Sequence, residues 1–309
     1  MWAALAAIAA SVVVAWLSLT GGKGGDEAVV VGADYDLGSG QMFDAIAPRY
    51  DLINKVISLG LDMRWRKTMI DGLQLQAGDR VMDMATGTAD VAIMMSKELI
   101  KLDASATRQH PVIGIDPSAN MLHVGRKKVE EAGLSSSVQL HIGDAQDLAD
   151  VPDGSIDKLT MAFGIRNVPN RLKALKEFRR IMVSYQEGIA EDNQEVPAAG
   201  AVIGEEDGAQ DHGERDRRGV GSIVAILELQ NPESGFLAFA SRGFVKYAAP
   251  VLGWVISGSG AEYGHLKNSI MAFPSVQEWT ELMAEAGLAV FSHQTMGFGT
   301  VHLYLARPT

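Results

Sequence analysis

The sequence predicts an α/β protein in which a mostly parallel sheet carries helices on both faces and ends in an antiparallel hairpin. One observation is that short apolar runs alternate with stretches of helical periodicity from residue 80 to residue 183. A second is that two β-like runs, separated by a short glycine-containing turn, lie at 289–306. Alternating strands and helices give parallel strands, and ligands of such sheets lie beyond the carboxyl ends of the strands.

The runs expected to form strands are short, apolar and bounded by polar or small residues. In chain order they are 80–86, 111–116, 138–144, 156–163, 222–229, 289–296 and 300–306. The last two are expected to pair in an antiparallel manner, because too few residues separate them for a helical crossover.

Helical stretches fill most of the remaining chain. Ser118 is a favourable N-cap, since its hydroxyl can accept a first-turn N–H, and Gly133 is a favourable residue for the end of the same helix. The other expected helices lie near 41–58, 61–72, from the first strand to about 101, 170–183, 234–257, 260–272 and 275–287.

The composition is that of a globular protein, with 47% hydrophobic and 21% charged residues among 309. The net charge of −11 is local, because ten acids and three arginines in 184–219 supply −7 of it. That segment is rich in Gly, Ala and acids and lacks periodicity, which predicts a disordered surface insertion. No basic patch indicates nucleic-acid binding, and the absence of cysteine excludes disulfides, thiolate metal sites and a cysteine nucleophile.

The N-terminal segment is unusually apolar. Residues 2–19 are 18 consecutive uncharged residues, near the lower limit for a membrane-spanning helix. No Lys or Arg precedes them, as one would in a cleaved signal peptide. We expect residues 1–20 to be an uncleaved membrane anchor, with a processed targeting segment as the alternative. Residues 21–40 then form a Gly-rich linker, and 41–309 form the folded domain.

The run VMDMATGTAD passes from an expected strand into a turn of small residues. A dinucleotide site uses G-x-G-x-x-G, whereas this turn has Gly87 and, nearby, Ala85, and Asp83 at the strand tip would repel a phosphate. A carboxylate beside such a turn can accept an ammonium group, so S-adenosylmethionine fits the loop. The alternative is a plain strand-to-helix turn capped by Thr88 or Asp90.

Further candidate residues stand at the ends of the next strands. Asp116, about 30 residues after the first turn, can accept the ribose hydroxyls of an adenosyl ligand or of NAD. Asp144 and Ala145 are placed to meet an adenine edge, although Asp144 could instead only cap the helix that follows. Phe163 ends the fourth strand. Together these positions favour an adenosyl ligand over NAD without excluding NAD.

Three motifs resemble the S-adenosylmethionine-dependent C-methyltransferases of ubiquinone and menaquinone biosynthesis. YDLINKVISLGLDMRWR (50–66) looks like that family's Y-D-x-M-N signature followed by S-x-G and Trp, with Ile53 in place of Met. FGIRNV (163–168) resembles the substrate-side motif, and LELQNP (227–232) stands where the family has L-E-F-S-x-P. The resemblance covers roughly 41–183 and 220–307. It implies a class I methyltransferase fold, a Rossmann-like sheet of seven strands with a reversed strand.

The resemblance also implies a reaction: methyl transfer to a ring carbon of a prenylated benzoquinol or naphthoquinol, as in ubiquinone, menaquinone or phylloquinone biosynthesis. By similarity, Arg166 lowers the pKa of a ring hydroxyl and stabilises the phenolate, while Asn167 orients it. Tyr50 and Asp51 would close the site, and a base or water relay is expected near the hydroxyl. This chain departs from the family's G-G-T-G-D loop at Ala89, where the family has glycine.

A lipid-soluble substrate would suit two apolar parts of the chain. The helices of 234–273 would form a tunnel or lid for the prenyl tail, and the N-terminal segment would hold the enzyme at a mitochondrial, plastid or bacterial cytoplasmic membrane. Members of the family often work as dimers or in larger complexes. The histidines lack metal-ligand spacing and are interpreted as structural or surface residues; they are His123, His141, His265, His293 and His302. The aromatic residues of the tunnel would be Phe236, Phe239, Phe244, Tyr247 and Trp254.

Two other functions fit parts of this pattern. One is a class I methyltransferase that acts on another lipid-like small molecule. The other is a non-catalytic scaffold subunit that binds quinone intermediates and uses 184–219 as an interaction arm. A measurement of cofactor binding would distinguish the scaffold from the two methyltransferase hypotheses, because a scaffold need not bind S-adenosylmethionine.

Overall fold

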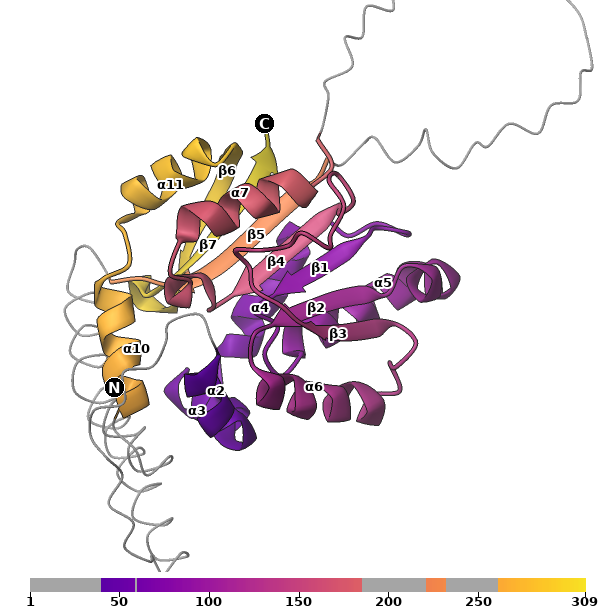
Figure 1. The fold of residues 1–309 in the computed structure, drawn as a ribbon, viewed down its shortest axis with the longest axis horizontal. Coiled ribbons are helices and arrows are strands. Elements are labelled where there is room, and N and C mark those ends of the chain that lie inside the picture. The colour runs from indigo at the N-terminus through magenta and orange to yellow at the C-terminus, as the bar shows by residue number, and fades with distance from the viewer. Residues whose placement is uncertain (1–39, 59, 185–220, 232–260) are drawn as a thin grey trace, which may run out of the picture.

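The predicted α/β class is confirmed. The structure, a computed structural model, describes residues 40–58, 60–184, 221–231 and 261–309. Within these ranges one seven-stranded sheet has the order β3-β2-β1-β4-β5-β7-β6 (Figure 1). Strands β1 to β5 are parallel, and β7 runs antiparallel between β5 and β6.

All seven apolar runs predicted as strands form strands. Their bounds are β1 (Val81–Met84), β2 (Val112–Asp116), β3 (Val138–Ile142), β4 (Lys158–Ala162), β5 (Ile223–Leu229), β6 (Leu288–Met296) and β7 (Val301–Pro308).

The helices follow the sequence prediction closely. Ser118 caps its helix as expected, since its Oγ accepts the backbone N–H of Met121 at 3.1 Å, and Gly133 takes a left-handed φ of 69° just after that helix. The helices are α2 (Gln41–Ile46), η1 (Ala47–Arg49), α3 (Tyr50–Ile57), α4 (Asp62–Gly72), α5 (Asp90–Gln109), α6 (Ala119–Glu131), η2 (Ile165–Asn167), α7 (Arg171–Ile181), α10 (Ala261–Met271), α11 (Val276–Glu285) and η5 (Gly297–Gly299).

Two helix boundaries differ from the prediction. The single helix expected at 41–58 is divided into α2, η1 and α3, because Pro48 has no N–H to bond to the carbonyl four residues earlier. Helix α5 continues past 101 to Gln109, with a kink where Asp103 leaves helical geometry (φ −158°, ψ 106°). The Asp103 carboxylate accepts the backbone N–H groups of Ser105 and Ala106 and so starts the last turns anew.

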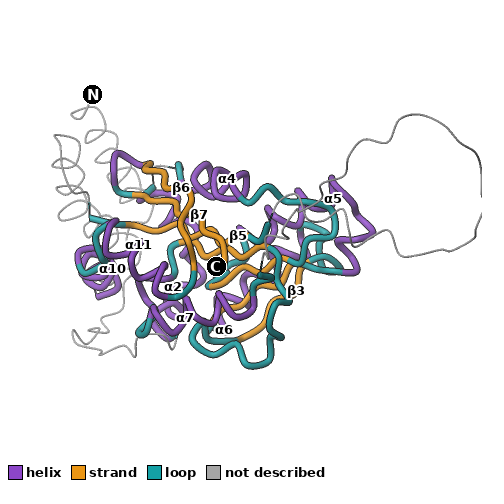
Figure 2. The backbone as a smooth tube through the Cα atoms, turned by 90° about the horizontal axis from the view of Figure 1, so that it is seen from above, coloured by secondary structure: helices purple, strands orange, loops and turns teal. Residues whose placement is uncertain are grey.

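Helices cover both faces of the sheet. Helices α4, α5 and α6 cover one face, and α7 and α11 cover the other (Figures 1 and 2). Fully buried side chains such as Met69 and Leu99 pack on the first face, and Phe178 and Trp279 pack on the second. Because both faces are covered, the central strands are apolar throughout, as parallel sheets usually are.

Small helices gather beyond the carboxyl ends of the parallel strands. Helix α2 and η1 lie against α6, and α10 lies against η2 (Figure 1). The predicted anchor at 1–20 and the predicted helix at 234–257, with its aromatic residues, lie outside the described residues. So do the predicted linker at 21–40, except Gly40, and the predicted insertion at 184–219, except Ser184. Within the described ranges, no helix has the length and apolar character that crossing a bilayer requires.

Candidate active site

Unusual backbone conformations gather where β1 and β4 end. Ala85, Ala89 and Phe163 have positive φ angles of 51°, 67° and 58°, and Gly87 has 55°. Among the described residues only one other non-glycine, Gln74, has a positive φ. Such residues cost energy and concentrate at ligand sites. The carboxyl edge of β1 and β4 is therefore the candidate site.

Asp83 is buried beneath the loop that connects β1 to α5 (85–89), which we call the first loop. One carboxylate oxygen accepts the hydroxyl of Thr86 and the other accepts the hydroxyl of Thr160, each at 2.7 Å. Burial raises the pKa of Asp83 to about 6, against the lowering effect of these two hydrogen bonds. Asp83 thus holds the loop on the sheet, and its contact with a ligand ammonium stays a prediction.

Asp116 connects the first loop to the second loop, the short turn between β2 and α6 (117–118). Its carboxylate accepts the backbone N–H of Gly87 at 2.9 Å and that of Ser118 at 2.8 Å, and burial raises its pKa to about 6. Glycine is favoured at position 87 because its φ of 55° is left-handed, and a Cβ there would lie 3.2 Å from the Met121 methyl carbon, which would have to shift slightly. The structure therefore brings Asp116 and Gly87 together.

A charge cluster ties α3 to this loop. The ammonium of Lys128, on α6, lies 2.8 Å from Asp51 Oδ2 and 3.1 Å from Thr88 Oγ1, and it also pairs with Asp90. The Thr88 hydroxyl donates to Asp51 Oδ1 at 2.6 Å. Asp51, Thr88 and Asp90, which the sequence predicts separately, meet around Lys128, which it does not single out.

Aromatic and cationic side chains from α4 reach the end of β4. The guanidinium carbon of Arg66 lies 5.8 Å from the centre of the Phe163 ring, and Trp65 meets the same ring edge-on at 6.4 Å. Arg66 also pairs with Asp62 and lies 3.7 Å from Asp90. Phe163 is thereby placed beside the first loop.

The N-terminal helices close over the strand ends. Asp44, on α2, accepts the hydroxyl of Ser118 and the backbone N–H of Asn120. Tyr50 meets Phe43 edge-on, with 6.2 Å between ring centres. Tyr50 therefore packs within the N-terminal helices, and its contact with a substrate stays a prediction.

Arg166 is held in a buried ion pair. Its Nη1 donates to Glu228 Oε1 at 2.6 Å and to the Phe163 carbonyl at 2.7 Å, while its backbone N–H reaches Glu228 Oε2 at 3.2 Å. The side chains of Arg166 and Glu228 are 7% and 0% exposed. The Nε of Arg166 is buried and has no hydrogen-bond partner among the described residues. Beside it, Asn167 Oδ1 lies 3.0 Å from Nε2 of His265, on α10.

Asp144 and Ala145 lie further along the same edge. Asp144 is exposed, and its carboxylate accepts the backbone N–H of Gln146, two residues further on, at 2.9 Å. Ala145 is buried. The short helix that Asp144 would cap in the alternative interpretation is not formed, because turns follow β3 instead. A contact between these residues and adenine stays a prediction.

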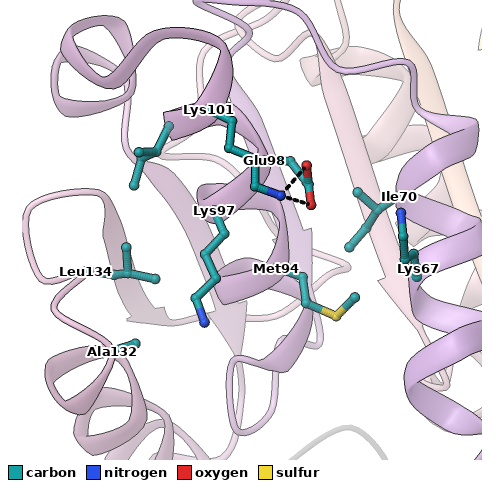
Figure 3. A pocket seen from close by; sticks show the side chains of 9 residues that line it. Lys67, Ile70, Met94, Lys97, Glu98, Lys101, Ala132 and Leu134 are labelled. Carbon is teal, nitrogen blue, oxygen red and sulfur yellow. Dashed lines mark hydrogen bonds and ion pairs between the residues drawn. The ribbon is translucent and has the colours of Figure 1, made fainter.

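A separate hollow of about 380 Å³ lies between α4 and α5 (Figure 3). Its apolar lining includes Ile70, Met94 and Leu134, and at its rim Lys101 pairs with Glu98. None of the predicted site residues lines it, so it is distinct from the candidate site.

The donor set of the candidate site fits the predicted adenosyl ligand. Its first loop is shaped by left-handed residues and backed by carboxylates, and Asp116 is suited to a ribose diol rather than to a phosphate. Sequence reasoning missed Asp44, Lys128, Glu228 and His265 as parts of this arrangement. Of these, Glu228 carried a signal, since it is a lone acid in the apolar run 222–229.

Comparisons with known proteins agree with this geometry. A family model described as the ubiE/COQ5 methyltransferase family matches residues 33–186 and 217–307. A demethylmenaquinone methyltransferase of Thermus thermophilus is 31% identical over 85% of this chain and 98% of its own length. A ubiquinone/menaquinone biosynthesis C-methyltransferase UbiE of Geobacter sulfurreducens is 30% identical over 85% of each chain.

The fold has solved relatives. A crystal structure from Thermotoga maritima, described as a SAM-dependent methyltransferase and possible histamine N-methyltransferase, aligns with a TM-score of 0.52 at 15% identity. It covers 87% of this chain and 100% of that chain, which identifies the sheet as a class I methyltransferase fold. Since the family model matches most of the chain, the chain belongs to the ubiE/COQ5 methyltransferase family.

Proposed function

We propose that this protein transfers a methyl group from S-adenosylmethionine to a ring carbon of a prenylated benzoquinol or naphthoquinol, in ubiquinone, menaquinone or phylloquinone biosynthesis. Family membership and the named activities of the two relatives support this substrate class. The observation that carries the proposal is that Asp116, the first loop and the Arg166–Glu228 pair lie along one edge of the sheet.

The first and second loops bind the cofactor in this proposal. When bound, S-adenosylmethionine supplies a methyl group already activated on a sulfonium. Asp116 accepts the ribose hydroxyls, because a carboxylate with two free acceptor directions suits a diol. The remaining cofactor-binding residues line the loop, the adenine side and the β4 end; they are Asp83, Ala85, Gly87, Thr88, Asp90, Asp144, Ala145 and Phe163.

The acceptor side rests on Arg166. Its guanidinium stays charged at neutral pH and cannot serve as a base, so it acts by stabilising a phenolate. Glu228 fixes its position, and the buried pair keeps the guanidinium at the end of β4. Asn167 orients the ring hydroxyl, and Tyr50 and Asp51 exclude water when the N-terminal helices close.

The remaining proposals rest on the sequence. Residues 1–20 anchor or target the protein to the membrane that holds its lipid substrate, residues 21–40 link this segment to the methyltransferase domain at 41–309, and 184–219 is a surface insertion. A homodimer or a larger quinone-biosynthesis complex is proposed by family resemblance.

The test is methyl transfer from labelled S-adenosylmethionine by the detergent-solubilised full chain. A reduced demethyl-benzoquinol and a reduced demethyl-naphthoquinol are offered in parallel, with Asp116→Ala as the control, and cofactor binding is measured by calorimetry. Label on either quinol, lost in the control, supports the proposal and identifies the ring. Cofactor binding with no label on either quinol would exclude this substrate class and favour another methyl acceptor, and no cofactor binding would favour the scaffold.

A further inference from the structure

His265 meets the substrate-side motif from a helix that is distant in the sequence. Helix α10 packs on η2, and Nε2 of His265 lies 3.0 Å from Asn167 Oδ1. An amide oxygen can only accept a hydrogen bond, so Nε2 carries the proton. In the neutral imidazole the lone pair is then on Nδ1, which makes no hydrogen bond within the described part of the chain.

The surroundings of His265 favour its neutral form. Burial lowers the pKa of His265 below 6.5, and the positive charge of Arg166 lowers it further. Glu228, facing from β5, is paired with Arg166 and offsets part of that charge. At neutral pH His265 is therefore an uncharged imidazole that can accept a proton.

Arg166 supplies the complementary group. Its side chain is 7% exposed, and its buried Nε–H has no acceptor among the described residues. A buried charged donor without an acceptor is costly, so a ligand oxygen at this place would be favourable. Both groups are held at η2, since Arg166 lies on it and His265 bonds to the adjacent Asn167. A hydrogen-bond donor and a proton acceptor at one short helix suit a ring hydroxyl that loses its proton.

We propose that His265 is the catalytic base that takes the proton from the ring hydroxyl, an inference that rests on the proposed function. The O–H bond breaks with its electron pair left on oxygen, and the proton goes to Nδ1. The ring carbon then bonds to the methyl carbon as the carbon–sulfur bond breaks with its pair on sulfur. The ring C–H proton leaves to solvent and His265 returns the hydroxyl proton, so each turnover releases one proton.

The test compares the full-length wild type with His265→Gln, His265→Ala and the control His141→Gln, which replaces an exposed histidine on β3. kcat and KM for the quinol are measured from pH 5 to 8.5, together with melting temperature and cofactor affinity. The pKa of His265 is measured by NMR on ¹³C-labelled histidine, with its signal assigned by its loss in His265→Gln.

A base predicts a specific pattern. His265→Gln should lower kcat by about 100-fold or more, with KM, melting temperature and cofactor affinity nearly unchanged. The wild-type rate should fall on the acid side with a pKa below 6.5 that matches the NMR titration, and this limb should vanish in His265→Gln. Added imidazole should restore part of the rate of His265→Ala, and His141→Gln should behave as wild type.

Other outcomes overturn the inference and are distinguishable from one another. If the wild type methylates a quinol and His265→Gln keeps its rate and its acid limb, His265 is not the base. If His265→Gln loses cofactor affinity or stability in step with kcat, its role is structural. If the wild type binds S-adenosylmethionine but methylates neither quinol, the proposed function fails and the inference fails with it.

Discussion

Two buried carboxyl groups, Asp83 and Asp116, fix the loop after β1 through different atoms. Asp83 accepts from two threonine hydroxyls, and Asp116 accepts from two backbone N–H groups. Burial raises both pKa values to about 6, so at neutral pH each group is charged at a cost in stability. The shape of the loop is thus maintained against the preference of its acids for water.

This cost predicts a pH dependence of stability that Asp83→Asn reduces, leaving the part that comes from Asp116. The folded pKa of Asp83 is raised above its ordinary value, so the folded state binds the proton more tightly, and stability falls as pH rises toward about 6. Lowering the pH from 7 to 5 should restore roughly 1 kcal/mol of unfolding free energy through this group. Urea unfolding at both pH values should show a smaller pH effect in Asp83→Asn than in the wild type.

A control variant is Asp150→Asn, which replaces an exposed carboxyl and should leave the pH effect unchanged. An equal pH effect in Asp83→Asn and wild type would mean that the protonation of Asp83 is not coupled to folding.

The ion pair between Arg166 and Glu228 should be sensitive to loss of one partner. Glu228→Gln leaves a buried guanidinium without a counter-charge, so the unfolding free energy should fall by about 3–5 kcal/mol. Glu177→Gln is the matched control, because its pair with Arg180 is partly exposed and should contribute about 1 kcal/mol or less. Urea denaturation measures both. Similar losses in the two variants would contradict the strong dependence of Arg166 on Glu228.

At the scale of elements, one hydroxyl connects two helices. Ser118 Oγ accepts the backbone N–H of Met121 and so caps α6, and it donates its own proton to Asp44 on α2. Helix α2 therefore depends on the cap of α6 for its position over the strand ends.

Ser118→Ala should consequently weaken two elements together. Loss of a cap costs about 1 kcal/mol of unfolding free energy, and amide exchange in 40–46 should become faster. The control is Asn170→Ala, which removes the cap of α7. The Asn170 side chain accepts the backbone N–H of Lys173 and is not bonded to the described residues of α2. This variant should lower the unfolding free energy without faster amide exchange in 40–46. Hydrogen exchange with mass spectrometry compares the two. Unchanged exchange in Ser118→Ala would show that α2 is held by other contacts.

The elements also show what sequence reasoning can reach. The seven strands could be predicted because each is a short apolar run between polar boundaries, and Asp83, Asp116 and Asp144 could be placed because parallel strands end at one edge. Pro48 is a sequence signal for a helix break, but the apolar periodicity of 41–58 favoured the prediction of one continuous helix. Lys128 and His265 could not be predicted, because their partners come from helices brought together only by tertiary packing.

At the scale of the whole molecule, the chain on either side of the acidic insertion is bonded to the start of β4. Val183 N–H donates to the Ile156 carbonyl, Ile223 N–H donates to that of Asp157, and Lys158 Nζ donates to that of Gly221. The family match also omits residues 187–216. The residues that flank this segment are therefore held in the fold by their own hydrogen bonds.

Replacing residues 187–216 with a short glycine-containing link should leave the fold intact. The melting temperature should change by less than about 4 °C, which corresponds to about 1 kcal/mol for a domain of this size. Calorimetry should show unchanged affinity for S-adenosylmethionine. A large fall in either quantity would show that the segment packs on the domain. A scrambled segment of equal length and composition separates an effect of sequence from one of length.

The end of α7 and the start of β5 lie at the amino ends of the parallel strands, whereas every candidate site residue on the sheet lies near the carboxyl ends. A fluorescent protein or an affinity tag could therefore be inserted between α7 and β5 without covering the candidate site. Such a fusion would leave both chain termini free, and it would allow the enzyme to be followed in living cells with its N-terminal segment unaltered.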